Sequence, residues 1–433
     1  MSSESKLKFG RDVISVEDAR TRLYPHAAKM AIEYVPLTQA FGRRLAVDVY
    51  ADHPVPHFRR SGVDGYAVRT ADIRHAAPES PVSLEVIERI PSGTMPKLTV
   101  GAGQAARIMT GAPVPDGADC VVMLEMTDSL QDAGAGAVGG ADAAGSGAGT
   151  NVSIKKNLPT GSNITPIAGE ITAGELLLPR GSLLGPGEAA ILATFGYSEV
   201  PVSRKPNVAI FSTGSELLNV ADALAPGRIR NSNSYMLAAQ VEAAGGVPHI
   251  WPALPDDANQ VQEALKRALT AADLVITSGG VSVGDYDVLV EVFGQWDGRL
   301  LFNKVAMRPG TPTSAALWQD KLLLALSGNP GASYVGFELF AKPLLKAMLG
   351  CAEPCAQTVS AYLDADYGKA SAYPRYVRGT MRIREGQLWV KPAGIDKSSV
   401  MVSIKDADCL IRLPAGGQGF QRGELVKIDL VHS

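Results

Sequence analysis

Three loops combine glycine, serine and asparagine in a way that suits the binding of an anion. They span residues 212–216, 278–287 and 327–333, and each follows an apolar run and precedes a helical pattern. Backbone N–H groups in such turns can face an anion, and the following helix adds the positive end of its dipole. A single loop of this kind reads as a Gly-rich turn. Three of them on successive strands indicate a pocket for an anion or a pterin.

Carboxylates gather at the same predicted edge. Glu216 follows the first turn, Asp256 and Asp257 precede a helical segment, and Asp285 and Asp287 follow the second turn. Each acid taken singly is explained as a helix N-cap or a first-turn residue. Together, several carboxylates beside a phosphate-type site indicate Mg²⁺, which prefers oxygen ligands and substrate phosphates.

Two polar turns lie earlier in the chain. SGVDGYAVR, residues 61–69, places Asp64 on a loop flanked by glycine and followed by an aromatic residue. RIMTGAPVPDGAD, residues 107–119, places Thr110 and Gly111 at a turn. Both segments are explained as tight turns, but binding and catalytic residues often lie on loops of this kind.

Several classes of enzyme are disfavoured by their missing motifs. No GxxxxGK(S/T) loop occurs, and none of the three loops matches GxGxxG with a following ribose-binding acid, so a P-loop NTPase or a nicotinamide dehydrogenase is not expected. No GxSxG elbow occurs, which argues against covalent acyl transfer. His53 and His57 cannot form a helical zinc pair because Pro54 and Pro56 interrupt them.

The elements that must position these residues alternate between strand and helix from Lys205 onward. NVAIFSTGSELL, ADLVITSGGVSVGDYDVL and KLLLALSGNPGASYVGFELF each read as an apolar run, a turn and a helical pattern. Further helical segments are predicted at residues 233–244 and 257–271. This alternation predicts a parallel, doubly wound sheet, whose ligands bind outside the carboxyl ends of the strands.

The rest of the chain reads mostly as β-structure. A helix is predicted at residues 15–28, and residues 66–122 and 163–202 are β-rich, with short β-branched runs between glycine and proline. After Cys351 the helices stop, and YVRGTMRIR, QLWVKP, VMVSIKDADCLIRLP and GELVKIDLV read as strands of a small closed or sandwich domain. The expected fold class is α/β plus β: a doubly wound three-layer domain, β-rich N-terminal modules and a C-terminal β-barrel-like domain.

These patterns divide the chain into four predicted domains. They are a β-rich connector (27–50 and 160–202), a β-rich module (51–159), an α/β domain (11–26 and 203–349) and a C-terminal β domain (350–433). Residues 133–150 inside the module read AGAGAVGGADAAGSGAGT, with almost no large apolar side chain to bury. We expect this insert to be a flexible surface loop.

Composition narrows the partners and the compartment. The 433 residues carry 41 Lys+Arg and 44 Asp+Glu, so the net charge is 41 − 44 = −3. Without a basic excess, general binding to nucleic acid or to an anionic membrane is not expected. The four cysteines are too few and too scattered for a disulfide framework, so we expect buried thiols in a reducing cytosol. With no signal peptide or transmembrane run visible, the predicted location is cytoplasmic.

The motifs, in their order, resemble the molybdopterin molybdenumtransferase family, which includes bacterial MoeA proteins and the E domain of gephyrin. The resemblance runs from about Val35 to Val431. It is carried by SGVDGYAVR, RIMTGAPVPDGADCVVM, FSTGSELL, SGGVSVGDYDVL, VAMRPGTPT, LSGNPGAS and SSVMVSIKDADCLIRLP.

The resemblance implies an enzyme of molybdenum cofactor biosynthesis. Such an enzyme takes adenylylated molybdopterin and molybdate in the presence of Mg²⁺ and yields the cofactor and AMP. It implies an elongated homodimer of four-domain protomers, with the cleft between the α/β domain of one protomer and the β module of the other. A MogA-like adenylyltransferase is the implied donor of the substrate.

The resemblance also implies roles for individual residues. The implied catalytic residues are Asp64, Thr110, Glu216 and Asp287. The implied substrate-binding residues are Ser212, Gly214, Asn233, Ser278, Gly279, Gly280, Arg308, Gly328, Asn329, Pro330 and Ser398. The implied metal ligands are Asp64, Glu170, Glu216, Asp256 and Asp287.

The chain departs from the family pattern at three positions. Glu170 stands where relatives commonly have Asp, which lengthens the reach of the carboxylate by one methylene. Arg308 stands where many relatives carry Lys, and its fork suits phosphate or another oxyanion. Thr311 stands where relatives carry a second Lys, so the pocket has one positive charge fewer unless Lys304 turns inward.

Two other functions compete with molybdenum transfer. The first is adenylylation of molybdopterin, as in single-domain MogA-like proteins, and the additional β domains argue against it. The second is a receptor-anchoring scaffold like gephyrin. The absence of a long linker and of a second, N-terminal α/β domain argues against that alternative.

Overall fold

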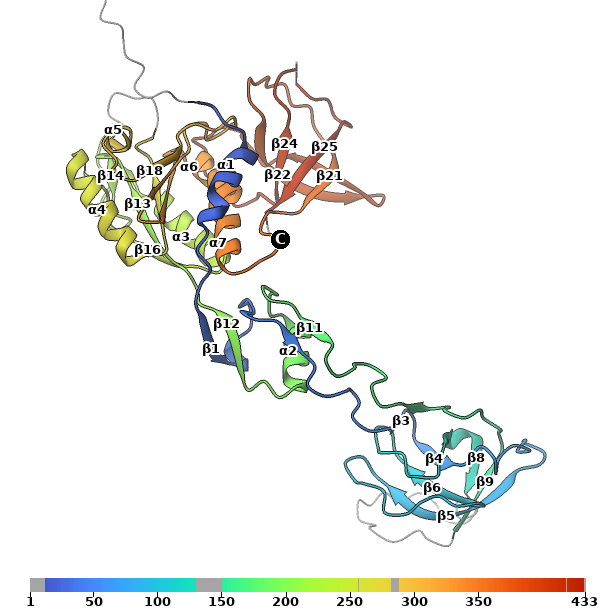
Figure 1. The fold of residues 1–433 in the computed structure, drawn as a ribbon. Coiled ribbons are helices and arrows are strands. Elements are labelled where there is room, and N and C mark those ends of the chain that lie inside the picture. Colours follow the sequence, from blue (N-terminus) through green and yellow to red (C-terminus); the bar gives the residue numbers. More distant parts are fainter. Residues whose placement is uncertain (1–11, 130–149, 256, 282–287, 418, 432–433) are drawn as a thin grey trace, which may run out of the picture. The chain divides into compact units, whose positions relative to one another are not determined.

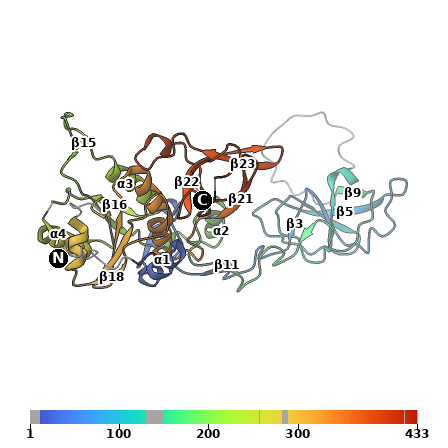
Figure 2. The ribbon, with the colours of Figure 1, turned by 90° about the horizontal axis from the view of Figure 1, so that it is seen from above.

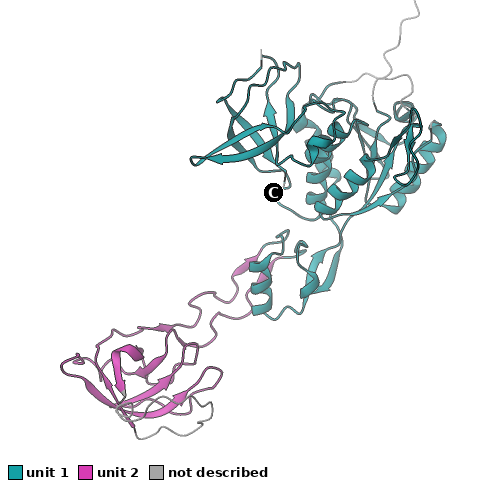
Figure 3. Cartoon of the chain, turned by 180° about the vertical axis from the view of Figure 1, so that it is seen from behind, with its two compact units in different colours: residues 1–47, 179–433 teal, residues 48–178 magenta. Residues whose placement is uncertain are grey.

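The computed structural model describes residues 12–129, 150–255, 257–281, 288–417 and 419–431. The described chain forms two compact units (Figure 3). Unit 1 contains residues 1–47 and 179–433, and unit 2 contains residues 48–178. The predicted division into four domains remains a prediction.

A six-stranded sheet forms the centre of unit 1 (Figure 1). Its three middle strands, β13 (Asn207–Ser212), β17 (Leu274–Ser278) and β20 (Lys321–Leu326), are parallel neighbours, and β16 (Val247–Ile250) lies parallel outside β13. The five residues of β17 are all buried, as expected of a strand covered on both faces.

The prediction of a wholly parallel sheet is wrong at one edge. β19 (Ser314–Trp318) and β18 (Arg299–Phe302) run antiparallel, which makes the sheet mixed. The reason is the connection between β19 and β20, where Gln319 and Asp320 both adopt positive φ, 47° and 63°. Two such residues form a tight hairpin turn, and a hairpin forces its strands to be antiparallel.

Helices cover both faces of this sheet, so the prediction of a three-layer, doubly wound domain is confirmed. One core lies between the sheet and α1 (Val16–Leu23), α3 (Asn233–Ala243) and the helices near residues 330–348. The other core lies under α4 (Ala258–Ala271) and α5 (Val288–Gly294) (Figure 1).

Local signals explain where two of these helices begin. Ser15 and Asp18 form a reciprocal capping box at the start of α1. Asp257 is the N-cap of α4, because its Oδ1 accepts the N–H of Gln260 at 2.9 Å. Asp257 therefore has the structural role that the sequence offered as its alternative.

The C-terminal part of unit 1 is a closed barrel, as predicted. Its interior is a separate apolar cluster. Its strands are β21 (Thr358–Leu363), β22 (Arg375–Arg384), β23 (Gln387–Pro392), β24 (Cys409–Leu413) and β25 (Leu425–Leu430).

Two predictions of β-structure fail in unit 1. The run VMVSIKDADCLIRLP is not one strand: Val402–Ile404 form a 3-10 turn, η5, and only Cys409–Leu413 form a strand. The β-rich stretch 163–202 contains a helix, α2 (Pro186–Thr194). Pro186 is pre-organised for the first helical position, and the Glu188 carboxylate accepts the N–H of Gly185 at 3.0 Å. In the same part of the chain β1 (Ile32–Pro36) pairs with β12 (Glu199–Ser203).

Unit 2 is built on a second six-stranded sheet. In order across the sheet its strands are β7 (Cys120–Met123), β4 (Gly65–Val68), β6 (Gln104–Ile108), β5 (Val82–Ile90), β9 (Thr150–Ile154) and β8 (Thr127–Ser129). All neighbours are antiparallel except β5 and β6. Apolar clusters lie on both faces, which explains why all four residues of β4 are buried.

Two short strand pairs complete unit 2. β3 (Arg60–Ser61) pairs with β10 (Ile164–Thr165), and β2 (Val49–Tyr50) pairs with β11 (Leu176–Leu178). Residues 133–149 of the predicted insert lie outside the described residues. Thr150, its last predicted residue, is instead the first residue of β9.

The structure bears on two predictions about the location of the protein, one from membrane-spanning helices and one from the cysteines. The described residues include no helix that is both long enough and apolar enough to cross a membrane. All four cysteines are free thiols. Cys120 and Cys409 are buried, as expected, but Cys351 is partly exposed and Cys355 is exposed, so the expectation that all four are buried is wrong. Both exceptions lie in the connection between α7 (Lys342–Met348) and the barrel.

Candidate functional site

The three Gly/Ser loops begin at the same level of one sheet edge. Ser212, Ser278 and Leu326 are paired across β13, β17 and β20. Two backbone hydrogen bonds extend this alignment past the strand ends: Thr213 N to Ser278 O at 3.0 Å, and Gly279 N to Leu326 O at 2.9 Å. The edge is the carboxyl end of parallel strands, where ligands of such sheets bind.

Two buried serines and two partly buried asparagines connect these loops. Ser212 and Ser278 are each 2% exposed. Asn231 Nδ2 donates to Ser212 Oγ at 2.9 Å, and Asn233 Nδ2 donates to Ser278 Oγ at 2.8 Å. The two serine hydroxyls therefore lie beneath the loops and hold them to the start of α3.

Asn233 also reaches the third loop. Its Nδ2 donates to the carbonyl of Gly328 at 2.7 Å, so one side chain joins α3, the second loop and the third loop. A carbonyl can only accept, which fixes the orientation of the amide. The buried Oδ1 of Asn233 is left without a hydrogen-bond partner among the described residues.

Backbone packs closely between the first and second loops. Gly279 has φ +99°, and a Cβ there would collide with the Thr213 hydroxyl. Only glycine fits this position. Gly280 follows with φ +71° and is more exposed than Gly279.

Glu216 is the exposed acid of the first loop. Its carboxylate folds back over Gly214, since an added Cβ at Gly214 would lie 2.5 Å from Glu216 Oε2. The backbone carbonyl of Glu216 accepts the N–H of Ile229 at 3.0 Å. That bond ties Glu216 to the base of the projecting segment formed by β14 (Leu217–Leu218) and β15 (Ile229–Arg230) (Figure 2).

The third loop contacts the barrel. Asn329 O accepts the N–H groups of Ala332 and Ser333, and Pro330 is the first residue of α6 (Pro330–Gly336). Gly331 N donates to Ser398 O at 2.8 Å. The structure thus places the predicted residues Asn329, Pro330 and Ser398 together at the start of one helix.

Arg378 on β22 is a residue of this region that the sequence reasoning missed. It is 5% exposed, and its Nη2 donates to Lys397 O at 3.1 Å. A Cβ at Gly331 would overlap its Nη1, so the guanidinium packs directly against the helix start. Burial lowers the pKa of Arg378 from its usual value. In the sequence it reads as an ordinary strand residue, and no local signal marks it.

Arg308 lies beside the barrel and is exposed. Its backbone N–H donates to Pro374 O at 2.9 Å, and its carbonyl accepts the N–H of Tyr376 at 2.8 Å. Thr311, where relatives carry Lys, donates its hydroxyl to Met307 O at 2.6 Å. Lys304 is partly buried. The guanidinium of Arg308 is therefore available to an anion from solvent.

Asp64 and Thr110 are in direct contact in unit 2. Asp64 Oδ1 accepts the Thr110 N–H at 2.6 Å and the Thr110 hydroxyl at 2.8 Å. The backbone bond first, then the side-chain bond and the charge of Arg107, lower the pKa of Asp64. Asp64 is exposed, so the structure presents an ionised carboxylate held at one oxygen.

Glu170 lies apart from this pair in its contacts. It is exposed, and its Oε2 is 3.7 Å from Arg60 Nη2. Such an exposed ion pair contributes little to stability. Asp256 and Asp287, together with Asp285, lie outside the described residues.

The described carboxylates bear on whether the protein can hold Mg²⁺. No group of three or more His, Cys, Asp or Glu side chains able to hold a metal occurs in the described parts of the chain. Mg²⁺ needs fewer protein ligands, since it commonly takes one or two carboxylates together with substrate phosphates and water. An exposed ionised carboxylate with one oxygen held, as at Asp64, fits that chemistry.

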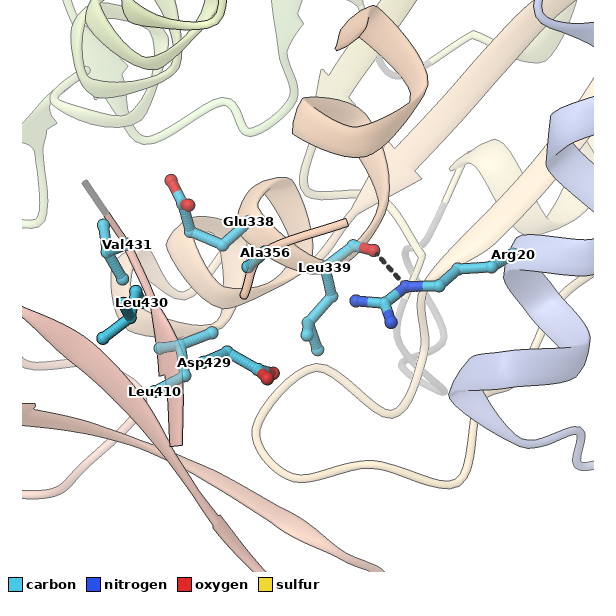
Figure 4. A pocket seen from close by; sticks show the side chains of 8 residues that line it. All are labelled: Arg20, Glu338, Leu339, Ala356, Leu410, Asp429, Leu430 and Val431. Carbon is cyan, nitrogen blue, oxygen red and sulfur yellow. Dashed lines mark hydrogen bonds between the residues drawn. The ribbon is translucent and has the colours of Figure 1, made fainter. Parts of the chain in front are cut away.

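A small pocket elsewhere in unit 1 shares no residue with the predicted site. It lies between α1, the π segment η4 (Phe337–Ala341) and the barrel (Figure 4). Its lining residues are Arg20, Glu338, Leu339, Ala356, Leu410, Asp429, Leu430 and Val431.

Comparison with known families covers almost the whole chain. Residues 14–196 match the MoeA N-terminal region (domain I and II), and residues 209–347 match a probable molybdopterin binding domain. Residues 360–431 match the MoeA C-terminal region (domain IV).

Relatives that match over nearly the whole chain indicate the same family. The molybdopterin molybdenumtransferase of Bacillus subtilis (strain 168) is 42% identical over 421 residues, covering 97% of this chain and 95% of that protein. The Staphylococcus aureus (strain MSSA476) protein of the same name is 39% identical, covering 98% and 97%. The crystal structure of a molybdopterin biosynthesis MoeA protein from Pyrococcus horikoshii OT3 matches with a TM-score of 0.80 at 29% identity, covering 97% of this chain and all of that one. The chain therefore belongs to the molybdopterin molybdenumtransferase (MoeA) family.

Proposed function

We propose that this protein inserts molybdate into adenylylated molybdopterin in the presence of Mg²⁺ and releases AMP and the molybdenum cofactor. The observation that carries the proposal is the meeting of three Gly/Ser/Asn loops at one sheet edge, held to the start of α3 by Asn231 and Asn233. Membership of the family supports the same reaction.

The loops would bind the phosphate and pterin parts of the substrate. Arg308, exposed beside the third loop's barrel contacts, would hold molybdate, which is a tetrahedral dianion. No protein nucleophile is needed for this reaction.

The acidic residues would hold Mg²⁺. When bound, Mg²⁺ supplies charge neutralisation at the phosphoanhydride that is broken. Asp64, already ionised and held by Thr110, is the best placed of the described candidates. The other proposed ligands are the exposed carboxylates of Glu170 and Glu216, together with Asp256 and Asp287.

We further propose that the protein acts as a homodimer. β1 exposes Ile32 and Tyr34, 49% and 67%, at alternate positions and hence on one face. Phe41 and Leu183 in the same unit are also exposed, 58% and 54%. Such exposed apolar side chains are typical of association surfaces. Light scattering should show a dimer, and a stable, active monomer would refute this part of the proposal.

The donor of the substrate would be a MogA-like adenylyltransferase, because adenylylated molybdopterin must come from transfer of an adenylyl group. We place the reaction in the cytoplasm. Four free thiols, two of them accessible to solvent, fit a reducing compartment.

One assay tests the central proposal. Purified protein with adenylylated molybdopterin and Mg²⁺ should release AMP only after molybdate is added, and the product should activate a molybdenum-free apoenzyme. Consumption of ATP with unmodified molybdopterin, without AMP release from the adenylylated form, would instead show an adenylyltransferase. Omitting Mg²⁺ should stop the reaction.

A further inference from the structure

The helix that follows the third loop contains a π turn in its middle. α6 continues into η4 (Phe337–Ala341), and η4 continues into α7 (Lys342–Met348). An α-helix turns by about 100° per residue, so the extra residue of a π turn rotates one end relative to the other by about that angle. The π turn therefore decides which face α6 presents to the sheet and to the barrel.

Pro343 gives this turn a cause in the sequence. In a regular helix residue 343 would donate its N–H to the carbonyl of Leu339, but proline has no N–H and its ring crowds that carbonyl. Leu339 is only 1% exposed, so water does not readily replace the missing donor. A donor from outside the helix can therefore stabilise this carbonyl.

Arg20 of α1 supplies that partner. Its Nε donates to Leu339 O at 2.9 Å, across 319 residues of sequence (Figure 4). Arg20 is itself 9% exposed, so its charge is directed into the protein. A bond from a charged donor to a buried carbonyl is stronger than one between neutral groups.

The preceding residue of the π turn, Glu338, is held from α3. Glu338 is 8% exposed and accepts Gln240 Nε2 at 2.9 Å and Lys342 Nζ at 3.1 Å. Two helices from different parts of the chain thus hold neighbouring residues of η4 in place.

The rotation of α6 matters at the candidate site. Gly331 donates to Ser398 O, and Arg378 occupies the space where a side chain at residue 331 would be. A rotation of about 100° would turn Gly331 away from Arg378 and bring a residue with a side chain toward it. The loop 327–331 would be displaced with the helix.

We propose that Arg20 is a positioning residue for the reaction. By holding the Leu339 carbonyl it maintains the π turn, and the π turn sets the orientation of α6 and of the third loop. This inference rests on the proposed function for its kinetic measurement, whereas its structural measurement does not depend on which reaction the protein catalyses.

The test compares Arg20→Met with wild type by hydrogen exchange and by steady-state kinetics. We expect amides of residues 330–336 to exchange at least tenfold faster, with kcat/KM for adenylylated molybdopterin about tenfold to a hundredfold lower. Arg20→Lys, which can still donate to the carbonyl, should recover most of both losses. Arg22→Met is the matched control, since Arg22 lies on the same helix, is exposed and bonds Leu301 O instead.

A second background isolates the contact. Pro343→Ala restores an N–H for the Leu339 carbonyl, so the effect of Arg20→Met on exchange should be much smaller there. An equal effect in both backgrounds would overturn the proposal, as would faster exchange spread evenly over unit 1.

If Arg20→Met does not fold, Gln240→Met tests the contact of η4 at Glu338 and should give the same exchange pattern with a smaller amplitude. Unchanged exchange at residues 330–341 in Gln240→Met would also overturn the proposal. If wild type releases no AMP, the proposed function fails, and the exchange results still decide the role of Arg20.

Discussion

The candidate site residues of unit 1 and of unit 2 differ in burial and in charge. In unit 1 Ser212 and Ser278 are buried, and Asn231 and Asn233 hold them with neutral hydrogen bonds. In unit 2 Asp64 is exposed and charged, and Thr110 donates both of the hydrogen bonds that its carboxylate accepts from the described residues.

This difference predicts which substitutions should change stability together with activity and which should change activity alone. Buried polar groups are costly to leave unpaired, so a change in the unit 1 network should affect stability as well as activity. An exposed carboxylate contributes little to packing, so a change at Asp64 should affect the reaction alone. The four predictions below test this separation.

Asp64→Asn should have the largest effect on activity. Asparagine keeps the shape but removes the negative charge that would face Mg²⁺, and the rate should fall about tenfold to a thousandfold. Because Asp64 is exposed, the Tm should hardly change. Cofactor formation and thermal unfolding are measured together. Asp128→Asn, an exposed acid of the same unit, is the control, and a Tm loss confined to Asp64→Asn would make it a structural turn residue.

Asn233→Ala should reduce both quantities. It removes the donor that joins Ser278 to Gly328 and should cost about 1–3 kcal/mol of unfolding free energy. The loops then separate, and we expect activity to fall about tenfold. Chemical denaturation and AMP release are the measurements, with exposed Asn219→Ala as control. Normal stability with lost activity would break the comparison, because the buried network would then be purely functional.

Thr110→Val should change the pH dependence of the rate. The folded pKa of Asp64 is lowered, so its ionised form persists at lower pH than in an ordinary Asp, and what it contributes is lost as pH falls through that lowered pKa. Removing the hydroxyl raises the pKa, so the acid limb of the rate profile should move to higher pH. The shift is partial, because the backbone N–H remains. Thr110→Ser should restore it, and an unmoved acid limb would show that Asp64 does not titrate in the reaction.

Shortening the insert should have the smallest effect. β8 and β9 are antiparallel neighbours, with Ser129 opposite Val152, so a short turn in place of residues 133–149 can join them. Closure entropy depends only weakly on loop length, about 0.6 kcal/mol for each doubling. Thr150 must stay, because it pairs with Val86. Thermal unfolding and AMP release should match wild type, and a loss of either would give the insert a structural or functional role.

Regular elements of the fold were predictable where their signals are local. Residues 233–244 and 257–271 matched α3 and α4 closely because the buried residues of each helix recur at short spacing, and α4 also has its own N-cap, Asp257. The antiparallel edge of the sheet could not be predicted, because an apolar run such as that of β19 does not show in which direction the strand runs. Helix α2 was obscured by glycine and proline on both sides.

The candidate site also has features that the sequence predicts and contacts that it does not. The loops after β13, β17 and β20 could be grouped because neighbouring parallel strands end at one edge. The sequence did not show that Asp64 and Thr110 touch, nor that Arg378 reaches Gly331. Both contacts depend on tertiary packing, across 46 residues in the case of Asp64 and Thr110, and neither leaves a periodic pattern.

The interruption of unit 1 by unit 2 has a consequence for the order of synthesis. Residues 1–47 leave the ribosome before unit 2, but β1 must wait for β12, and Arg20 must wait for Leu339. Unit 2 has all of its own strands by residue 178, so we expect it to fold first during translation. The two ends of unit 2 are paired through β2 and β11, so folding of unit 2 brings together the two points at which the chain enters and leaves unit 1. Unit 1, whose two segments are synthesised before and after unit 2, can therefore assemble once β2 and β11 have paired.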